Sequence, residues 1–339
     1  MNEEHRICSR REFVRNTGAL MAGAGLSTAF SFSGPTFASG SPAPARIPLG
    51  TLGRTGVQIS RMGIGCAPLS RKHVGVEDVR TVLYRALELG INYVDVAPNY
   101  GNEESGFSEE KMGPTIKEIR DRVFLVTKTE EATYEGTWRL LRQSMKRLHT
   151  DHFDMVHLHN FGHEERFPDL SVVLSKKGAL GALLEARKQG VIRFIGASGH
   201  LYPSRFHAAL ETGEIDVLMN AVNFVTQHTY DFEHKVWSRA RNENLGLVAM
   251  KVLGGRARNG NGFRLPKKFY QQAIGYALSV PGLSCAVIGV ENKEQLEKAA
   301  TTVAQLQPLS YEEGYELSKA GLKLAGTSPW KAVYGDPVT

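Results

Sequence analysis

Four polar residues have the types and the spacing that proton transfer requires. They are Asp95 and Tyr100 in the stretch "VDVAPNYG", Lys128 in "FLVTKT" and His159 in "HLHN". A free phenol has a pKa of about 10 and exchanges protons poorly at neutral pH. A lysine ammonium beside a phenol lowers that pKa, and an aspartate keeps the lysine charged and oriented. Because a histidine can hydrogen-bond a substrate oxygen, the four types together predict acid–base chemistry at an oxygen atom.

The elements that must position these residues recur regularly. Eight short apolar runs alternate with amphipathic stretches along the chain: "RMGIGCAP", "INYVDVAP", "RVFLVTKT", "FDMVHLHN", "VIRFIGAS", "IDVLMNAV", "LGLVAMKV" and "CAVIGV". Between the first two runs, Val79, Leu83 and Ala86 share one helical face. Strands that alternate with helices predict an α/β protein with a parallel sheet, and eight strands close into a (β/α)8 TIM barrel.

This barrel is preferred to a doubly wound open sheet. An open sheet should show a glycine fingerprint after its first strand, but "GIGCAP" lacks the third glycine and runs into Pro68. Residues 47–60, two short runs around "GRTG", predict a β-hairpin before the barrel. The longest loops, residues 160–177 and 252–266, follow the fourth and seventh strands. We expect both to overhang the C-terminal face, where barrel active sites are built.

In this arrangement three of the four polar residues lie at the ends of consecutive strands. Asp95 ends the second strand, Lys128 the third and His159 the fourth. Neighbouring strands lie about 4.8 Å apart, so the three side chains can converge over one mouth of the barrel. Tyr100 follows the second strand by a few residues and should lie just above them. The pattern therefore predicts one site that contains all four.

The first 45 residues require a separate interpretation. The stretch "SRREFVRN" contains Arg10 and Arg11, and the run that follows is modestly apolar and rich in glycine and alanine. It is too weak for a transmembrane helix, which needs about 20 strongly apolar residues, so we expect no stable membrane insertion. It resembles a twin-arginine export signal, and "SPAPA" supplies a cleavage pattern ending at Ala45. We expect residues 1–45 to be signal peptide and linker, recognised by the twin-arginine export machinery. Residues 46–339 then form a single periplasmic barrel domain; an uncleaved flexible arm is the alternative.

Composition narrows the remaining function classes. The formal charge of +6 has several of its cations in the first fifteen residues, and the rest of the chain has no basic block. An anionic cofactor therefore explains the charge better than a nucleic acid. Neither a Cys-x-x-Cys pair nor a His/Cys cluster indicates a metal. Cys66 and Cys285 lie at opposite ends of their predicted strands, roughly 10 Å or more apart, which argues against a disulfide between them.

Nearly everything after residue 47 resembles the aldo-keto reductases. The similarity rests on "LGRTGVQISRMGIG", "YVDVAPNYGNEESGFSEEKMG", "FLVTKT", "HLHN", "IRFIGASGH" and "VIGVENKEQLEKAA". The resemblance implies a (β/α)8 barrel in which a nicotinamide cofactor, NADP(H) or possibly NAD(H), exchanges hydride with a carbonyl or alcohol substrate. It makes Tyr100 the general acid, Lys128 and Asp95 the residues that tune it, and His159 the residue that orients the carbonyl.

The resemblance also implies a set of cofactor contacts. Ser198 and Asn220 occupy positions that bind the nicotinamide carboxamide. Lys251, Gly254 and Gly289 fall where the pyrophosphate is held, because glycine lets backbone approach closely and the helix after residue 292 offers its N-terminal amides. Each of these residues could equally serve a turn or the packing.

Three positions depart from the family pattern. Met250 stands where many relatives place an aromatic ring, and Gly199 replaces a common Asn. Gln295 falls where many relatives carry an arginine for the adenosine 2′-phosphate, and glutamine cannot supply that charge. A preference for NADPH is therefore in doubt, unless a lysine compensates: Lys251, Lys293 or Lys298.

Two other functions remain open. One is a non-catalytic nicotinamide-binding regulatory module of the same fold, which the presence of all four reactive residues disfavours. The other is a barrel isomerase or lyase acting on phosphorylated sugars, which needs a basic phosphate site and no nicotinamide pocket. The substrate itself is not encoded in any pattern, since the loops that would shape its pocket vary freely.

Overall fold

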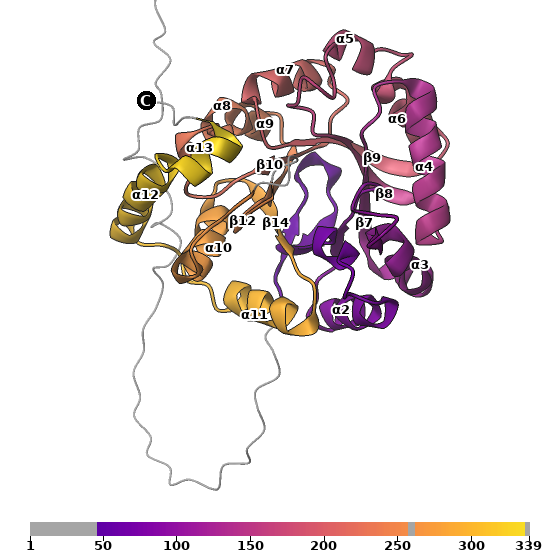
Figure 1. Ribbon diagram of the computed structural model, residues 1–339. Coiled ribbons are helices and arrows are strands. Elements are labelled where there is room, and N and C mark those ends of the chain that lie inside the picture. Colours follow the sequence, from indigo (N-terminus) through magenta and orange to yellow (C-terminus); the bar gives the residue numbers. More distant parts are fainter. Residues whose placement is uncertain (1–45, 257–261, 336–339) are drawn as a thin grey trace, which may run out of the picture. The chain divides into compact units, whose positions relative to one another are not determined.

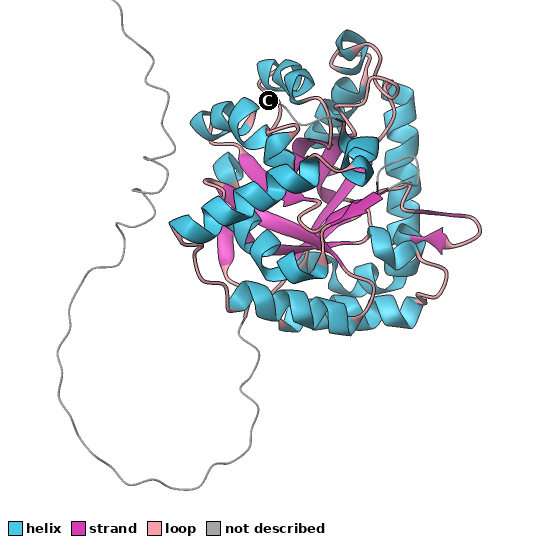
Figure 2. Cartoon of the chain, turned by 60° about the vertical axis from the view of Figure 1, so that its left-hand side comes forward, coloured by secondary structure: helices cyan, strands magenta, loops and turns pink. Residues whose placement is uncertain are grey.

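The structure, a computed structural model, describes residues 46–256 and 262–335. The predicted export signal and the domain boundary at residue 45 fall outside or at the edge of these residues. Eight parallel strands form a closed barrel in the order β10-β11-β14-β3-β4-β7-β8-β9 (Figures 1 and 2). In chain order they are β3 Met62–Gly65, β4 Tyr93–Asp95, β7 Phe124–Thr129, β8 Phe153–His159, β9 Ile192–Gly199, β10 Val217–Ala221, β11 Gly246–Met250 and β14 Leu283–Gly289. The prediction of a (β/α)8 barrel is confirmed.

Helices surround the strands on the outside of the barrel (Figure 1). They are α2 Val76–Glu88, α3 Ser108–Ile119, α4 Tyr134–Leu148, α6 Ala179–Lys188, α7 Pro203–Glu211, α8 Phe232–Lys235, α9 Trp237–Asn242, α10 Tyr270–Ser279 and α11 Lys293–Ala304. Short 3-10 turns cover Gly53–Thr55, Ala67–Ser70, Arg120–Arg122, Thr226–His228 and Lys267–Phe269. No helix in the described ranges is long and apolar enough to cross a membrane.

Strand alternation divides the apolar side chains into two layers. On β7, Phe124 and Val126 belong to a cluster inside the barrel, whereas Leu125 belongs to the larger cluster between strands and helices. Successive strand side chains point to opposite faces, so the whole strand reads as one apolar run although only every second residue faces inward. This parity decides which polar side chain at a strand end reaches the mouth of the barrel.

A hairpin closes the N-terminal end of the barrel, as predicted. Its strands, β1 Leu49–Thr51 and β2 Gln58–Ser60, pair antiparallel, and Leu52 and Ile59 pack into the inner cluster. Gly53 has φ 49°, and a Cβ there would lie 2.3 Å from the backbone of Leu245. Only glycine fits this close approach without strain.

The C-terminal side of the barrel carries more structure than the two predicted loops suggest. The first loop contains the short helix α5 Leu170–Val173, and the second contains a hairpin of β12 Gly254–Arg256 and β13 Gly262–Arg264. A further small hairpin, β5 Gly101–Asn102 with β6 Gly106–Phe107, follows β4. Two helices without a counterpart in the predictions, α12 Tyr311–Ala325 and α13 Ser328–Tyr334, end the described chain and lie next to each other (Figure 1).

These last helices pack on the loops of the C-terminal face. Trp330 of α13 meets Phe263 of β13 with ring centroids 5.2 Å apart, and its Nε1 donates to Thr229 Oγ1 at 2.9 Å. In α12, a Cβ at Gly321 would lie 2.1 Å from the carbonyl oxygen of Phe224. The helix therefore lies directly on the segment that follows β10.

Cys66 and Cys285, the two cysteines within residues 46–335 that the structure describes, are free and buried. Ala286 pairs with Met62 at the beginning of β3, whereas Cys66 follows the end of that strand. Cys285 and Cys66 thus lie at opposite levels of neighbouring strands, which is the geometry that argued against a disulfide.

Candidate active site

Strand parity brings three of the predicted catalytic side chains to the inside of one mouth. Asp95 shares its strand face with Tyr93, and Lys128 shares its face with Phe124 and Val126, all within the inner cluster. His159 has the parity of the inward residue Met155. Each side chain ends its strand or lies one residue from that end, so the three converge at the C-terminal end of the barrel.

The lysine and the aspartate form a buried ion pair. Lys128 Nζ lies 2.5 Å from Asp95 Oδ1 and donates a second hydrogen bond to the carbonyl oxygen of Val96 at 2.8 Å. The two side chains are 0% and 3% exposed. An ammonium held by two acceptors in an apolar surrounding has a fixed position, which a solvated lysine does not have.

Tyr100 lies above this pair. Its ring packs against the core, Lys128 Nζ is 5.2 Å from the ring centroid, and the ring of His159 meets it edge-on at a centroid distance of 6.4 Å. The backbone of Tyr100 is fixed on both sides, since its N–H donates to Ala97 and its carbonyl accepts from Ser108. The four predicted residues are therefore neighbours.

One expectation about Tyr100 is wrong for this structure. We predict from the residue types that Lys128 lowers the phenol pKa, but the pKa is raised well above 10 by burial, with smaller contributions from the charges of Asp95, Cys66 and Glu130. The physical reason is burial of the phenol, which disfavours the phenolate, while the Lys128 ammonium is hydrogen-bonded to Asp95 and Val96. The phenol is consequently protonated at neutral pH, the state that a proton donor needs.

His159 is held in a neutral state, with a different neighbour at each ring nitrogen. Its Nδ1 lies 3.1 Å from Ser198 Oγ, and its Nε2 lies 3.6 Å from Glu130 Oε1. Burial lowers the pKa of His159 well below 6.5, and the nearby charge of Lys128 adds to this effect. A neutral imidazole can donate one hydrogen bond but supplies no positive charge to the mouth.

The predicted carboxamide contacts, Ser198 and Asn220, are both buried and both already bonded. Ser198 orients His159, while Asn220 accepts from Trp237 Nε1 at 2.9 Å and donates to the carbonyl of Gly199 at 3.3 Å. Asn220 therefore lies on the side of β10 that faces the helices. At Gly199, a Cβ would lie 2.8 Å from Phe206 Cζ, so the ring of Phe206 leaves no room for the asparagine common among relatives.

Lys251 and Gly254 follow β11 in unusual backbone conformations. Lys251 has φ 54°, and burial lowers its pKa while the charge of Asp95 opposes this shift. Such a conformation is uncommon for a residue with a side chain. Gly254 has φ 73°, and a Cβ there would lie 2.2 Å from the carbonyl oxygen of Phe263 across the β12–β13 hairpin. The hairpin alone thus requires glycine at residue 254.

At the end of β14, Gly289 is exposed on the inward face beside Gly65 of β3. A Cβ at Gly65 would lie 3.3 Å from Gly289, and one at Gly289 would lie 3.1 Å from Pro68. Because neither strand end carries a side chain, backbone is accessible at this part of the mouth. A flat or phosphate-bearing ligand could approach here more closely than at any position with a Cβ.

The helix α11 begins next to this opening with Asn292 as its N-cap, whose side chain accepts from the N–H of Gln295. Gln295 donates to Glu291 Oε1 at 2.7 Å, and the same carboxylate pairs with Arg71 and lies 3.4 Å from His73 Nε2. Burial by itself would raise the pKa of Glu291, but the hydrogen bond from Gln295 and the charge of Arg71 outweigh it, and the pKa is lowered. The side chain of Gln295 is therefore held against a carboxylate at the beginning of α11.

The sequence patterns missed three polar residues near the mouth. Glu130 and Arg166 form an ion pair beside His159, and His157 is buried on the inward face of β8. Glu130 follows β7 directly, so the rule that identified Lys128 could also have found it. Arg166 lies in a loop, and nothing in the sequence pairs it with Glu130. His157 looks like one more residue of an apolar run.

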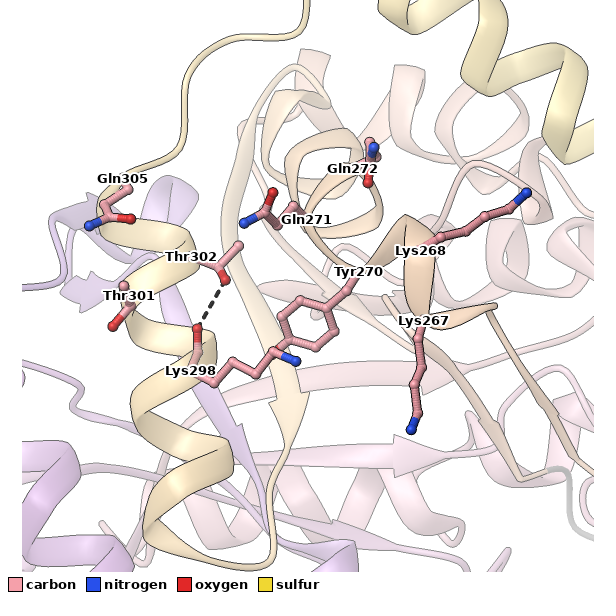
Figure 3. Close-up of a pocket in the computed structure, with 9 residues that line it drawn as sticks. All are labelled: Lys267, Lys268, Tyr270, Gln271, Gln272, Lys298, Thr301, Thr302 and Gln305. Carbon is pink, nitrogen blue, oxygen red and sulfur yellow. Dashed lines mark hydrogen bonds between the residues drawn. The ribbon is translucent and has the colours of Figure 1, made fainter.

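A separate pocket lies on the outside of the barrel between α10 and α11 (Figure 3). It has a volume of about 490 Å³, and its lining includes Lys267, Lys268 and Lys298. The Lys298 ammonium lies 4.6 Å from the centroid of the Tyr270 ring. None of the four predicted catalytic residues lines it. Lys298, one of the possible substitutes for the missing arginine, is therefore directed toward Tyr270.

Comparison with known proteins assigns the chain to a family. Residues 61–273 match the Aldo/keto reductase family. The chain belongs to that family.

Individual relatives are more distant. L-galactose dehydrogenase of Arabidopsis thaliana is 23% identical over 302 residues, which cover 79% of this chain and 92% of the plant protein. The aldo-keto reductase YhdN of Bacillus subtilis is 33% identical over 159 residues, covering 42% and 44% of the two chains.

Solved structures share the fold. The holo form of an aldo-keto reductase from Bacillus halodurans has a TM-score of 0.64 at 21% identity, covering 81% of this chain and 96% of its own. An aldo/keto reductase from Klebsiella pneumoniae in complex with NADP and acetate has a TM-score of 0.62 at 20% identity, covering 86% and 96%.

Proposed function

We propose that this chain is an NAD(P)H-dependent oxidoreductase that interconverts aldehydes or ketones with alcohols. The observation that carries the proposal is the buried Lys128–Asp95 pair beneath Tyr100, with His159 opposite. Family membership supports the oxidoreductase class, and the NADP bound to the Klebsiella relative supports the cofactor.

The side chains divide the acid–base work at the substrate oxygen. Tyr100, protonated because burial raises its pKa, donates its proton to the oxygen as the carbonyl is reduced. The proton transfer leaves a phenolate, and Asp95 holds the Lys128 ammonium beside that ring, 5.2 Å from its centroid. If Ser198 donates to Nδ1 of His159, Nε2 carries the proton and hydrogen-bonds the same oxygen. The reduced nicotinamide, when bound, supplies the hydride.

The residues around the mouth fit such a cofactor. Gly289 and Gly65 leave the backbone accessible, and the N-terminal end of α11 favours phosphate. The charge of Asp95 acts on the pKa of Lys251, so the Lys251 ammonium is a cation in the neighbourhood of the mouth. Asn220 is fully buried and makes its two bonds on the helix side of β10, so of the two predicted carboxamide contacts Ser198, beside His159, is the one that lies at the mouth. Gly254 and Gln295 would act through backbone and amide groups rather than charge.

The test is turnover by the purified full chain. We expect NADPH or NADH to bind and to be oxidised when simple aldehydes or ketones are added, measured by the loss of reduced-nicotinamide absorbance. Cofactor binding without turnover of any carbonyl compound would favour the regulatory module. Failure to bind either cofactor would instead favour an isomerase or lyase.

We also propose that the protein is exported to the periplasm by the twin-arginine route, on the basis of Arg10 and Arg11. Replacing both with lysine should keep the protein in the cytoplasm at its full size, because the export machinery reads the arginine pair as an address. Fractionation followed by immunoblotting checks this. Arrival of the double variant in the periplasm at the normal processed size would contradict it. Since this route carries folded proteins, the nicotinamide would travel already bound.

A further inference from the structure

An ion pair that the mechanism does not use stands next to His159. Glu130 Oε2 pairs with Arg166 Nη1, and Glu130 Oε1 accepts from Asn99 Nδ2 at 2.5 Å while lying 3.6 Å from His159 Nε2. The Glu130 and Arg166 side chains are 14% and 12% exposed. The Glu130 carboxylate therefore lies near the nitrogen that faces the substrate oxygen in the proposed function, and Arg166 is bound to that carboxylate.

The next residue along the chain offers a comparison. Glu131 also pairs with an arginine, Arg139, but the two side chains are 36% and 64% exposed. A surface pair costs little, whereas moving a pair out of water carries a desolvation penalty that apolar residues would avoid. The Glu130–Arg166 pair carries that desolvation penalty beside the reaction site. Apolar residues could have filled the same space without it, so a role beyond packing is indicated.

The loop that supplies Arg166 buries its two phenylalanine rings in the core. Phe161 and Phe167 are fully buried and pack on each other, and Phe161 also packs on Phe206. This loop therefore offers polar rather than aromatic groups near His159. Within the described ranges, the buried Arg166 Nε has no hydrogen-bond partner. A buried donor of this kind is satisfied when a ligand brings an acceptor.

We propose that Glu130 and Arg166 bind a hydroxyl group adjacent to the reacting carbonyl, so that they select hydroxylated carbonyl compounds of the sugar type. A hydroxyl both donates and accepts, which matches a carboxylate beside a guanidinium. A substrate oxygen bonded to His159 Nε2 places the neighbouring hydroxyl within reach of Glu130 Oε1. A substrate carboxylate at this place would meet repulsion from Glu130. The assignment rests on the proposed function, which puts the reacting oxygen at Tyr100 and His159.

The test compares glyceraldehyde with propanal, which have equal carbon chains, in the full-length protein and in Glu130→Gln. We expect kcat/KM to favour glyceraldehyde, and the variant to lose roughly ten- to a hundredfold of that preference through glyceraldehyde alone, the scale of a hydrogen bond to a charged group. Arg166→Gln should also lower kcat/KM for glyceraldehyde. Glu131→Gln, the matched control, should change kcat/KM for neither aldehyde.

A binding measurement separates this inference from the proposed function. The sugar alcohol sorbitol has no carbonyl to reduce, so it is unreactive toward the reduced cofactor. Titrated calorimetrically into the protein with bound NADPH, it should bind the parent chain and bind Glu130→Gln at least tenfold more weakly. Turnover of both aldehydes with an unchanged ratio in Glu130→Gln would overturn the inference and leave the proposed function standing. Sorbitol binding that depends on Glu130, without turnover of any aldehyde, would support the hydroxyl site and contradict the proposed function. A preference for glyoxylate over both aldehydes would also overturn the assignment.

Discussion

The two halves of the barrel mouth are built differently. On the β4–β8 side, charged side chains meet directly, as in the Lys128–Asp95 pair with Tyr100 above it. On the β14–β3 side, the strand ends carry glycines, and the carboxylate of Glu291, just after β14, is held in place by Arg71 and Gln295. One side positions atoms for chemistry through side chains, and the other leaves space and backbone for a ligand.

The difference shows which part of a site depends on residue type. A proton donor and its cation must be particular residues, so substitution there removes the chemistry. A cradle for a cofactor depends on where backbone can approach, and several sequences can provide that. We therefore expect substitutions on the β4–β8 side to have large effects and those on the β14–β3 side to shift preferences.

The largest expected effect is on stability, from Lys128→Met. This variant leaves the Asp95 carboxylate buried without its cation, and breaking a buried pair typically costs about 3–5 kcal/mol of unfolding free energy. Burial already raises the pKa of Asp95, so the orphaned carboxyl should take up a proton at neutral pH. Urea denaturation of the two proteins measures the difference.

Arg139→Met is the matched control, because it breaks an exposed pair and should cost less than about 1 kcal/mol. Adding Asp95→Asn to Lys128→Met should recover part of the loss, since an amide is neutral without the free-energy cost of protonating a buried carboxylate at neutral pH. If both single variants were equally stable, the Lys128–Asp95 pair would contribute nothing that a surface pair does not.

Tyr100→Phe should have the next largest effect, on turnover alone. The variant keeps the ring that packs on the core but removes the proton donor, so carbonyl reduction should fall by at least about 100-fold, or about 2.7 kcal/mol. Cofactor binding and the unfolding free energy should stay close to those of the parent. Steady-state kinetics with a cofactor titration measures both, and Tyr84→Phe at the surface is the control. Near-normal turnover would move the proton source to His159 or water.

The same contrast explains what could be predicted from the sequence. The barrel and the hairpin followed from strand and helix periodicity, and the neighbourhood of Asp95, Lys128 and His159 followed from polar types at strand ends. The direction of the Tyr100 pKa shift did not, because it depends on how deeply the phenol is buried, which residue types and spacing do not reveal.

The sequence also could not predict the roles of residues that depend on a partner far away along the chain. Asn220 is bonded to Trp237, and Gly254 is required by Phe263 across its own hairpin. Glu130 meets Arg166 only because a loop folds back over the mouth. Pattern analysis assigns such residues by position along a strand, and position does not reveal which side chain or backbone atom they meet.

The smallest effect is expected on the β14–β3 side, from Glu291→Gln. If α11 receives the adenosine 2′-phosphate, the Glu291 carboxylate repels it and also occupies Arg71, which could otherwise pair with it. The variant should shift the ratio of NADPH to NADH dissociation constants toward NADPH by about 1–2 kcal/mol, roughly five- to thirtyfold. Fluorescence titration with each cofactor measures the ratio, and Glu104→Gln, which removes a carboxylate from an exposed pair with Lys72, is the control.

Gln295→Arg sharpens this prediction, because Gln295 is the residue that takes the place of the family's arginine. Alone, the introduced guanidinium should pair with the Glu291 carboxylate, which Gln295 already contacts at 2.7 Å, and the shift toward NADPH should be small. Combined with Glu291→Gln, the same substitution should have its full effect, so the double variant should exceed the sum of the two single variants. Strict additivity would mean that Glu291 does not compete with the phosphate. An unchanged ratio in all three variants would mean that the phosphate does not reach α11, and the open side of the mouth would then hold the cofactor by its backbone alone.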